Sequence, residues 1–300
     1  MNFPITNCAL EGFQVIKRAP LAVVAWIVLY LVAIGLMFWG LFAAMGQAGL
    51  LTAFGADIPR DTTDPTAVFK AMGPMLGVFG LMFPASIVLS MVMLCAIMRA
   101  VLRPEDKGFF YLRLGGDELR VFVVALVYYI LAIVLFGALI GGIVLGCIAE
   151  WQANKGLSIL IGFAGGCAVF AIAVVFWNKL CLSFPATFAT RSIRLFDGWA
   201  LSRGRFWPLV GMNLLALLIG MAISIGFSMV AQIFQASAMG SMVRSAGGGS
   251  PFVLNGPVLI SFALAMAVNM IGAVVQMVVV YSPAAAAYRE IVRPNQAAEF

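Results

Sequence analysis

Histidine is missing from this chain, and charged residues are scarce. None of the 300 residues is histidine, and only 10% are Asp, Glu, Lys or Arg, whereas a soluble domain carries about 25% charged residues. Without histidine the chain has no Ser-His-Asp or Cys-His catalysis, no histidine-ligated metal or haem, and no histidine proton relay. Because 63% of the residues are hydrophobic, the shortage of charge predicts a membrane protein.

The positions of the cysteines and of the acidic residues also argue against disulfides, metal binding and catalysis within the membrane. No two of the five cysteines have CxxC spacing, so we expect no disulfide framework and no metal site. The acids lie outside the long apolar stretches, which excludes two-Asp intramembrane proteolysis and argues against a proton-coupled carboxylate relay. A serine-protease mechanism would have only Lys179 as its base. We therefore expect no enzymatic activity and no cofactor.

The chain contains six long stretches without a charged residue. They cover residues 19–56, 71–98, 121–149, 156–178, 206–243 and 245–288. Each is long enough to cross a bilayer, which takes about 20 apolar residues in a helix. The sequence thus predicts an all-α integral membrane protein with six transmembrane helices, forming a single membrane domain over residues 1–300.

Six crossings sort the 18 Lys and Arg residues into two unequal sets. One side receives fourteen: Lys17, Arg18, Arg99, Arg103, Lys107, Arg113, Arg120, Lys179, Arg191, Arg194, Arg203, Arg205, Arg289 and Arg293. The other side receives four: Arg60, Lys70, Lys155 and Arg244. Basic loops stay in the cytoplasm, so we expect both termini there. The net charge of +6 indicates attraction to anionic headgroups, and no basic domain is present that would bind nucleic acid.

The spans group into three hairpins of similar design, with units at about 1–104, 105–194 and 195–300. MRAVLRPED (98–106) parallels YREIVRPNQ (288–296), with Arg-x-x-x-Arg-Pro in both. All three units would enter from the same side, as parallel repeats do. Apolar segments resemble one another easily, so true triplication and incidental similarity both remain open.

Three polar residues stand in apolar surroundings, each thirteen positions before the arginine that ends an even-numbered span: Ser86, Asn178 and Gln276. Polar groups in a membrane turn toward the bundle, because an unsatisfied group in hydrocarbon costs several kcal/mol. These residues are candidates for a polar layer between the even helices. Two interpretations stay open, ordinary interhelical hydrogen bonding and a substrate site.

Lys179 is a candidate intramembrane charge. If the fourth span continues to residue 190, Lys179 lies within the membrane, where a charge indicates a functional site. If the span ends near Asn178, the side chain extends to the headgroup region instead.

The segment RSIRLFDGWALSRGRFW (191–207) has an apolar side and a basic side. This pattern predicts a short amphipathic helix in the cytoplasmic interface, and FFYLRLGGDELRVF (109–122) occupies the equivalent place in the preceding connection. Either both are re-entry helices, or they form a platform for anionic lipid or a protein partner. The candidate lipid contacts are Arg191, Arg194, Arg203 and Arg205.

The stretches SFPATFATRSIRLF and GWALSRGRFWPLVGMNLLALL, with GFQVIKRAPLAVV near the N-terminus, resemble six-span bacterial membrane proteins. These are similar to the membrane domain attached to some glycerophosphodiester phosphodiesterases and to the uncharacterised YciC-like family. The likeness covers most of the chain in layout, but its sequence signal is confined to 185–215 and the N-terminal stretch. It implies a bacterial inner membrane and a lipid-related context. It implies no catalysis, because the phosphodiesterase domain is absent from the sequence.

Two functional hypotheses follow from these features. The first is a non-enzymatic inner-membrane protein that acts as an accessory, scaffold or lipid-handling protein, with membrane lipids, anionic ones included, and a protein partner or second copy as its contacts. The second is a transporter or permease for an apolar or amphiphilic solute, which the parallel repeats and the polar layer favour.

Overall fold

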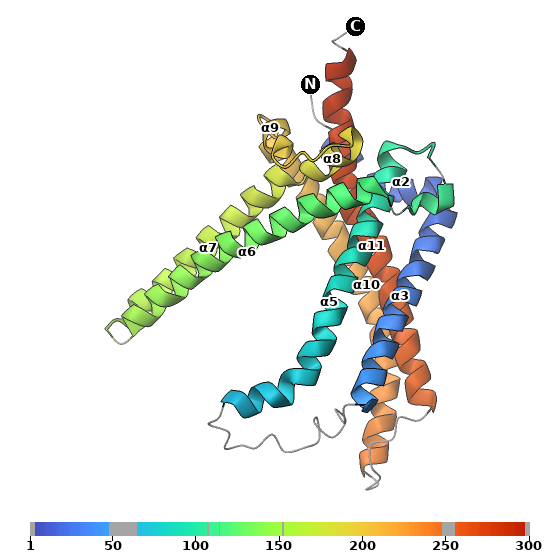
Figure 1. Ribbon diagram of the computed structural model, residues 1–300, viewed down its shortest axis with the longest axis vertical. Helices are drawn as coiled ribbons and strands as arrows, with labels where there is room; N and C mark the ends of the chain where they lie inside the picture. Colours follow the sequence, from blue (N-terminus) through green and yellow to red (C-terminus); the bar gives the residue numbers. More distant parts are fainter. Residues whose placement is uncertain are drawn as a thin grey trace. The chain divides into compact units, whose positions relative to one another are not determined.

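A computed structural model describes residues 4–47, 65–106, 108–113, 115–151, 153–247 and 256–297, and this part of the chain contains helices but no strand. The helices, labelled in Figure 1, are α1 (Ile5–Ala9), α2 (Glu11–Arg18), α3 (Pro20–Gln47), α5 (Pro65–Leu102), the 3-10 helix η1 (Gly108–Tyr111), α6 (Gly116–Trp151), α7 (Lys155–Leu180), α8 (Ser183–Thr190), α9 (Asp197–Leu201), α10 (Phe206–Gly247) and α11 (Gly256–Ala297).

Six of the described helices are long and apolar enough to cross a membrane: α3, α5, α6, α7, α10 and α11. The prediction of an all-helical chain with six membrane-length helices is confirmed. Two of these helices begin with proline: Pro20 is the first residue of α3 and Pro65 is the first residue of α5. Proline suits the first turn of a helix because its missing N–H would have no partner there.

The chain divides into two compact units. The first comprises Met1–Ala19, Leu94–Ala222 and Gln276–Phe300, and the second comprises Pro20–Met93 and Ile223–Val275. The grouping into three hairpins at 1–104, 105–194 and 195–300, and the single domain over 1–300, stay predictions.

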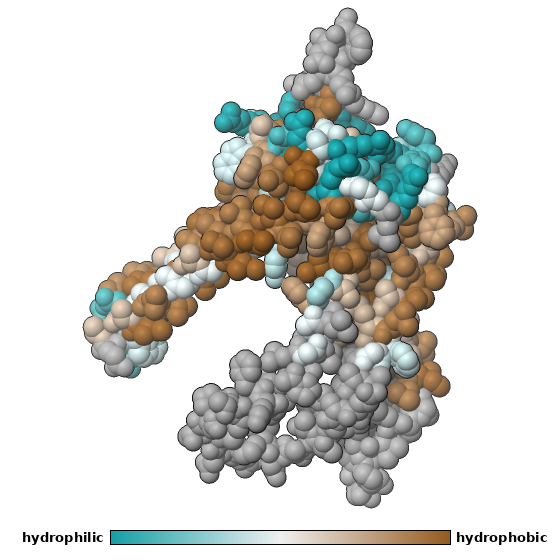
Figure 2. All heavy atoms as spheres, viewed as in Figure 1, coloured by the Kyte–Doolittle hydropathy of each residue, from teal (hydrophilic) through white to brown (hydrophobic). Residues whose placement is uncertain are grey.

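In the first unit, α6 and α7 pack side by side along their length (Figure 1). Ser158 of α7 donates a hydrogen bond to the Cys147 carbonyl oxygen at 2.8 Å. A Cβ atom added to Gly165 would lie 2.7 Å from Ile143 Cδ1, so glycine allows the close approach of the two helices. Figure 2 shows hydrophobic side chains along this pair and hydrophilic ones gathered where α5 ends and α6 begins. The hydrophilic side chains of this part of the first unit therefore gather at the ends of its apolar helices.

In the second unit, small residues bring α10 and α11 together. A Cβ atom on Gly272 would lie 2.6 Å from Phe227 Cβ, and Ala231 and Ala265 are each 1% exposed. Close packing of small residues is the usual way in which helices associate in lipid.

Both segments expected to be amphipathic re-entry helices differ from that expectation. Within 109–122, residues Phe109 to Tyr111 take left-handed backbone angles, and the helical part from Gly116 onward is the first turn of α6. Within 191–207 only α9 is helical before α10 begins, because Arg191 and Gly204 have φ of 54° and 74°. Positive φ is incompatible with a continuous right-handed helix.

Candidate functional site

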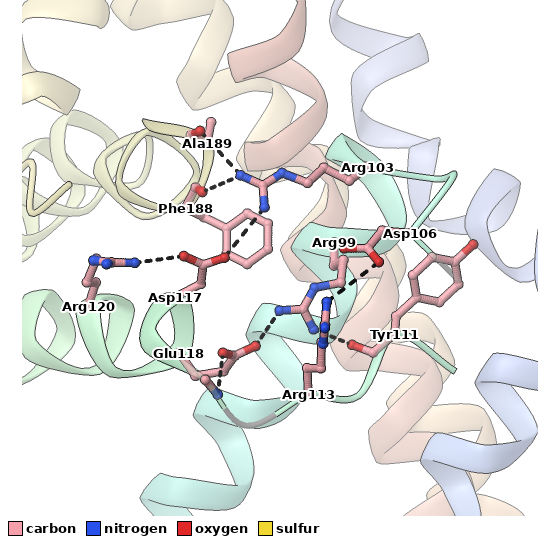
Figure 3. Close-up of polar contacts among 11 residues, drawn as sticks. Arg99, Arg103, Asp106, Tyr111, Arg113, Asp117, Glu118, Arg120, Phe188 and Ala189 are labelled. Atoms are coloured by element: carbon pink, nitrogen blue, oxygen red, sulfur yellow. Dashed lines mark hydrogen bonds and ion pairs between the residues drawn. The ribbon is translucent and has the colours of Figure 1, made fainter. Parts of the chain in front are cut away.

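The first unit brings ten residues together around an open hollow of ≈ 450 Å³. They come from the end of α5, the connection to α6, the start of α6 and the residue after α8: Arg99, Arg103, Asp106, Arg113, Gly115, Gly116, Asp117, Glu118, Arg120 and Arg191. Figure 3 shows most of these side chains and their polar contacts. We call this place the arginine hollow.

Arg99 and Glu118 form a buried ion pair in the wall of the hollow. Their side chains are 4% and 9% exposed, and Arg99 Nη2 lies 2.5 Å from Glu118 Oε1. Arg99 Nη1 donates to the Tyr111 carbonyl oxygen at 2.7 Å, while the Gly115 N–H donates to Glu118 Oε2 at 2.9 Å. Both charges are therefore paired and hydrogen-bonded, as buried charges must be.

The connection between α5 and α6 has a strained backbone at the point where it meets Arg99. Phe109, Phe110 and Tyr111 have φ of 47°, 57° and 64°, and left-handed angles cost roughly 1–2 kcal/mol for each non-glycine residue. The Tyr111 hydroxyl donates to the Pro104 carbonyl oxygen at 3.1 Å, and the Tyr111 carbonyl oxygen accepts from Arg99. The tyrosine is thus held at both ends, and the buried arginine stabilises the strained conformation.

Arg103 joins α5, α6 and α8. Its Nη2 donates to the carbonyl oxygens of Phe188 and Ala189 at 3.2 and 3.4 Å, and its Nη1 lies 3.5 Å from Asp117 Oδ2. A cation at the carbonyl end of a helix is favourable because those carbonyls lack partners within the helix. Its guanidinium carbon also lies 5.1 Å from the centre of the buried Phe188 ring, a favourable cation–π distance.

The remaining arginines of the hollow keep donors available. Arg120 pairs with Asp117 at 2.8 Å, but Arg113 reaches Asp106 only at 3.8 Å and is 69% exposed. Arg191 is exposed, and within the described part of the chain its side chain has no hydrogen-bond or ion-pair partner. Five arginines face three carboxylates, so the lining has a net charge of +2.

A second ion-pair cluster links the N-terminal and C-terminal segments of the same unit. Glu11, 3% exposed, accepts from Arg18 and Arg289, each at 3.3 Å. Arg289 Nη1 also donates to the Val101 carbonyl oxygen at 3.3 Å, and a Cβ atom on Gly12 would lie 2.6 Å from Val279 Cα. Helix α2 is therefore packed on α11 and fixed by charge.

Asn178, one of the three polar-layer candidates, is buried and forms an amide pair with Asn213. Asn178 Oδ1 accepts from Asn213 Nδ2 of α10 at 2.8 Å, and Asn178 Nδ2 donates to the Val174 carbonyl oxygen at 2.8 Å. Asn213 was not among the predicted site residues, although it is a polar residue within an apolar run.

The other two candidates have different surroundings. Ser86, which belongs to the second unit, donates to the Phe83 carbonyl oxygen of its own helix at 2.7 Å. Gln276 is half-buried beside Gly220 of α10. The common layer of Ser86, Asn178 and Gln276 stays a prediction.

Lys179 lies in the last turn of α7, which ends at Leu180. Its Nζ lies 3.8 Å from the centre of the Trp199 ring of α9. The contact is a cation–π interaction. Helix α7 ends at Leu180, but the apolar candidate span continues through α8 to Thr190, so both interpretations of Lys179 stay predictions.

The segment from Arg191 to Arg205, which we call the arginine platform, is fixed to the neighbouring helices. The Leu195 carbonyl oxygen accepts from the hydroxyls of Tyr128 and Ser183, and Ser183 Oγ accepts from the Gly198 N–H at 3.0 Å. The four arginines predicted as lipid contacts are all exposed: Arg191, Arg194, Arg203 and Arg205. Among them Arg194 pairs with Asp197 at 2.9 Å.

Among the described residues no group of three or more His, Cys, Asp or Glu side chains has the geometry to hold a metal ion. No known family model, curated protein or solved structure matches the chain.

Proposed function

We propose that this protein is a non-enzymatic, lipid-handling protein of the bacterial inner membrane, with both termini in the cytoplasm and the arginine platform in contact with anionic headgroups. The observation that carries the proposal is the platform itself: four exposed arginines on a segment that hydrogen bonds fix to α6 and α8. A fixed segment loses little conformational entropy when it binds, so its charges bind lipid efficiently.

Charge and hydropathy support the same assignment. The fourteen-to-four distribution of Lys and Arg supports an orientation in which the platform faces the negatively charged cytoplasmic leaflet. Hydrophobic side chains along α6 and α7 adjoin the hydrophilic gathering at the start of α6 (Figure 2), as expected where a helix leaves the hydrocarbon for the headgroup layer.

The test is lipid retention measured by native mass spectrometry from nanodiscs that contain phosphatidylcholine and phosphatidylglycerol. A basic residue near an anionic leaflet is worth about 1 kcal/mol, so Arg203→Gln with Arg205→Gln should reduce phosphatidylglycerol retention about thirtyfold. The matched control, Lys155→Gln with Arg244→Gln, removes the same charge from the opposite side and should change retention little. Equal loss in both double variants would contradict the proposal.

A transport function for an apolar or amphiphilic solute is the second candidate, and the buried Asn178–Asn213 pair favours it. Two amides that bond to each other inside apolar helices can exchange that bond for one to a passing solute. Uptake of an amphiphilic dye into proteoliposomes, lost in Asn178→Leu, would support this candidate. Equal dye uptake in protein-free liposomes would contradict it.

A further inference from the structure

We propose that the arginine hollow binds a phosphate monoester group. The inference rests on the proposed function, because it assigns the headgroup chemistry that a lipid-handling protein would select. The hollow shares Arg191 with the arginine platform and is otherwise formed by the end of α5, the α5–α6 connection and the start of α6.

The charge of the lining decides between classes of anion. Five arginines and three carboxylates line the hollow, which leaves two positive charges unneutralised at pH 7. A phosphate monoester carries about −1.5 to −2 at this pH, whereas a phosphodiester such as phosphatidylglycerol carries one negative charge and a zwitterionic headgroup has none. The monoester is the anion that brings the hollow closest to neutrality.

The hollow also separates arginines that build its wall from arginines that are free to bind. Arg99 and Arg103 are held by carboxylates and by backbone carbonyls, so they form a rigid wall. Arg191 is without a side-chain partner among the described residues, and the Arg113–Asp106 distance of 3.8 Å is too long for a hydrogen bond. Free guanidinium groups bind phosphate oxygens in a bidentate manner.

The start of α6 adds positive charge to the same side of the hollow. Gly115 and Gly116 both line it, and α6 runs from there for 36 residues. A helix N-terminus carries about half a positive charge, which favours an anion nearby. The Gly115 N–H already donates to Glu118 Oε2, so the start of α6 contributes this partial charge and the neighbouring Arg120 guanidinium, which lies 3.5 Å from the Cβ position of Gly116.

The size of the hollow, ≈ 450 Å³, lies within the roughly 300–1,000 Å³ range of small-molecule sites. A hollow of this size has room for a phosphate and the glycerol unit attached to it. Phosphatidic acid and soluble glycerol 3-phosphate share this chemistry, and the experiment distinguishes between them.

The experiment uses the full chain in phosphatidylcholine nanodiscs that contain either phosphatidic acid or phosphatidylglycerol, with retention measured by native mass spectrometry. We expect the wild-type protein to retain phosphatidic acid roughly tenfold better than phosphatidylglycerol. Arg191→Gln should remove most of this preference, and Arg191→Lys should keep part of it. The matched control Lys17→Gln removes an exposed charge outside the hollow and should leave the preference unchanged.

The outcomes separate this proposal from the one on which it rests. If wild-type protein retains both anionic lipids equally, or if Arg191→Gln leaves the preference intact, the monoester site is wrong while anionic-lipid handling stands. If neither lipid is retained above phosphatidylcholine, both proposals fail.

A second variant and a competitor complete the design. Should Arg191→Gln not fold, Arg113→Gln, at a mostly exposed position, must lower the preference or the proposal is overturned. Competition by glycerol 3-phosphate would identify a soluble monoester as the ligand, and retention without competition would identify the lipid.

Discussion

Removing Arg99 should strongly destabilise the first unit. In Arg99→Met the Glu118 carboxylate, 9% exposed, loses its ion-pair partner and keeps only the Gly115 N–H. The Tyr111 carbonyl oxygen loses its donor at the same time, and Tyr111 is the last of three consecutive residues with positive φ. Leaving one partner of a buried ion pair alone costs about 3–5 kcal/mol, which is the expected loss in the free energy of unfolding.

The assay is a reversible SDS titration in mixed micelles, in which unfolding is monitored as the loss of the helical circular dichroism signal. The exposed pair Arg194–Asp197, with side chains 49% and 42% exposed, supplies the control. Arg194→Met should change the free energy of unfolding by at most about 1 kcal/mol, as is usual for surface pairs.

A double variant tests the reason for the loss. In Arg99→Met with Glu118→Leu no charge is left unpaired in the wall, so the double variant should be more stable than the sum of the single variants predicts. A loss below about 1 kcal/mol in Arg99→Met, or strictly additive effects, would refute the claim that this pair is buried and coupled.

Two further predictions concern the packing of the same unit. A Cβ atom on Gly198 would lie 2.5 Å from Ser183 Oγ and 2.8 Å from the Lys179 carbonyl oxygen. Gly198→Ala should therefore lower the free energy of unfolding in the SDS titration by about 1–3 kcal/mol. The control Gly211→Ala, whose added methyl group meets open space, should not lower it. Burial raises the pKa of the Cys8 thiol to about 11, so maleimide should label Cys8 of the folded protein slowly at pH 8 and faster as the pH rises. In SDS-denatured protein the same thiol should react at once. Rapid labelling of Cys8 in folded protein at pH 8 would contradict its burial.

The six spans could be predicted from sequence because length and hydropathy alone decide which segments cross a bilayer. The ends of the helices could not be predicted as well. Helix α10 continues to Gly247 and α11 to Ala297, beyond residues 243 and 288, where the charge-free stretches end. Backbone hydrogen bonding continues past the apolar part of a helix, and hydropathy does not report it.

The site was predictable in part. The exposed arginines of the platform followed from an amphipathic pattern, although the expected helix was wrong at Arg191 and Gly204. The Arg99–Glu118 pair was not foreseen, since counting charges for topology says nothing about which ones meet. The left-handed conformation of Phe109 to Tyr111 has no sequence signal at all, because neither Gly nor Asn stands there.

We predict that the end of the first unit that carries both the arginine hollow and the arginine platform faces the cytoplasm. Single-cysteine labelling with a membrane-impermeant maleimide tests it across one helix, α7. Cysteine at Ala153, before α7, should react in intact spheroplasts, and cysteine at Ala200 in α9 should react only after permeabilisation. The reverse pattern would contradict the orientation and with it both lipid proposals.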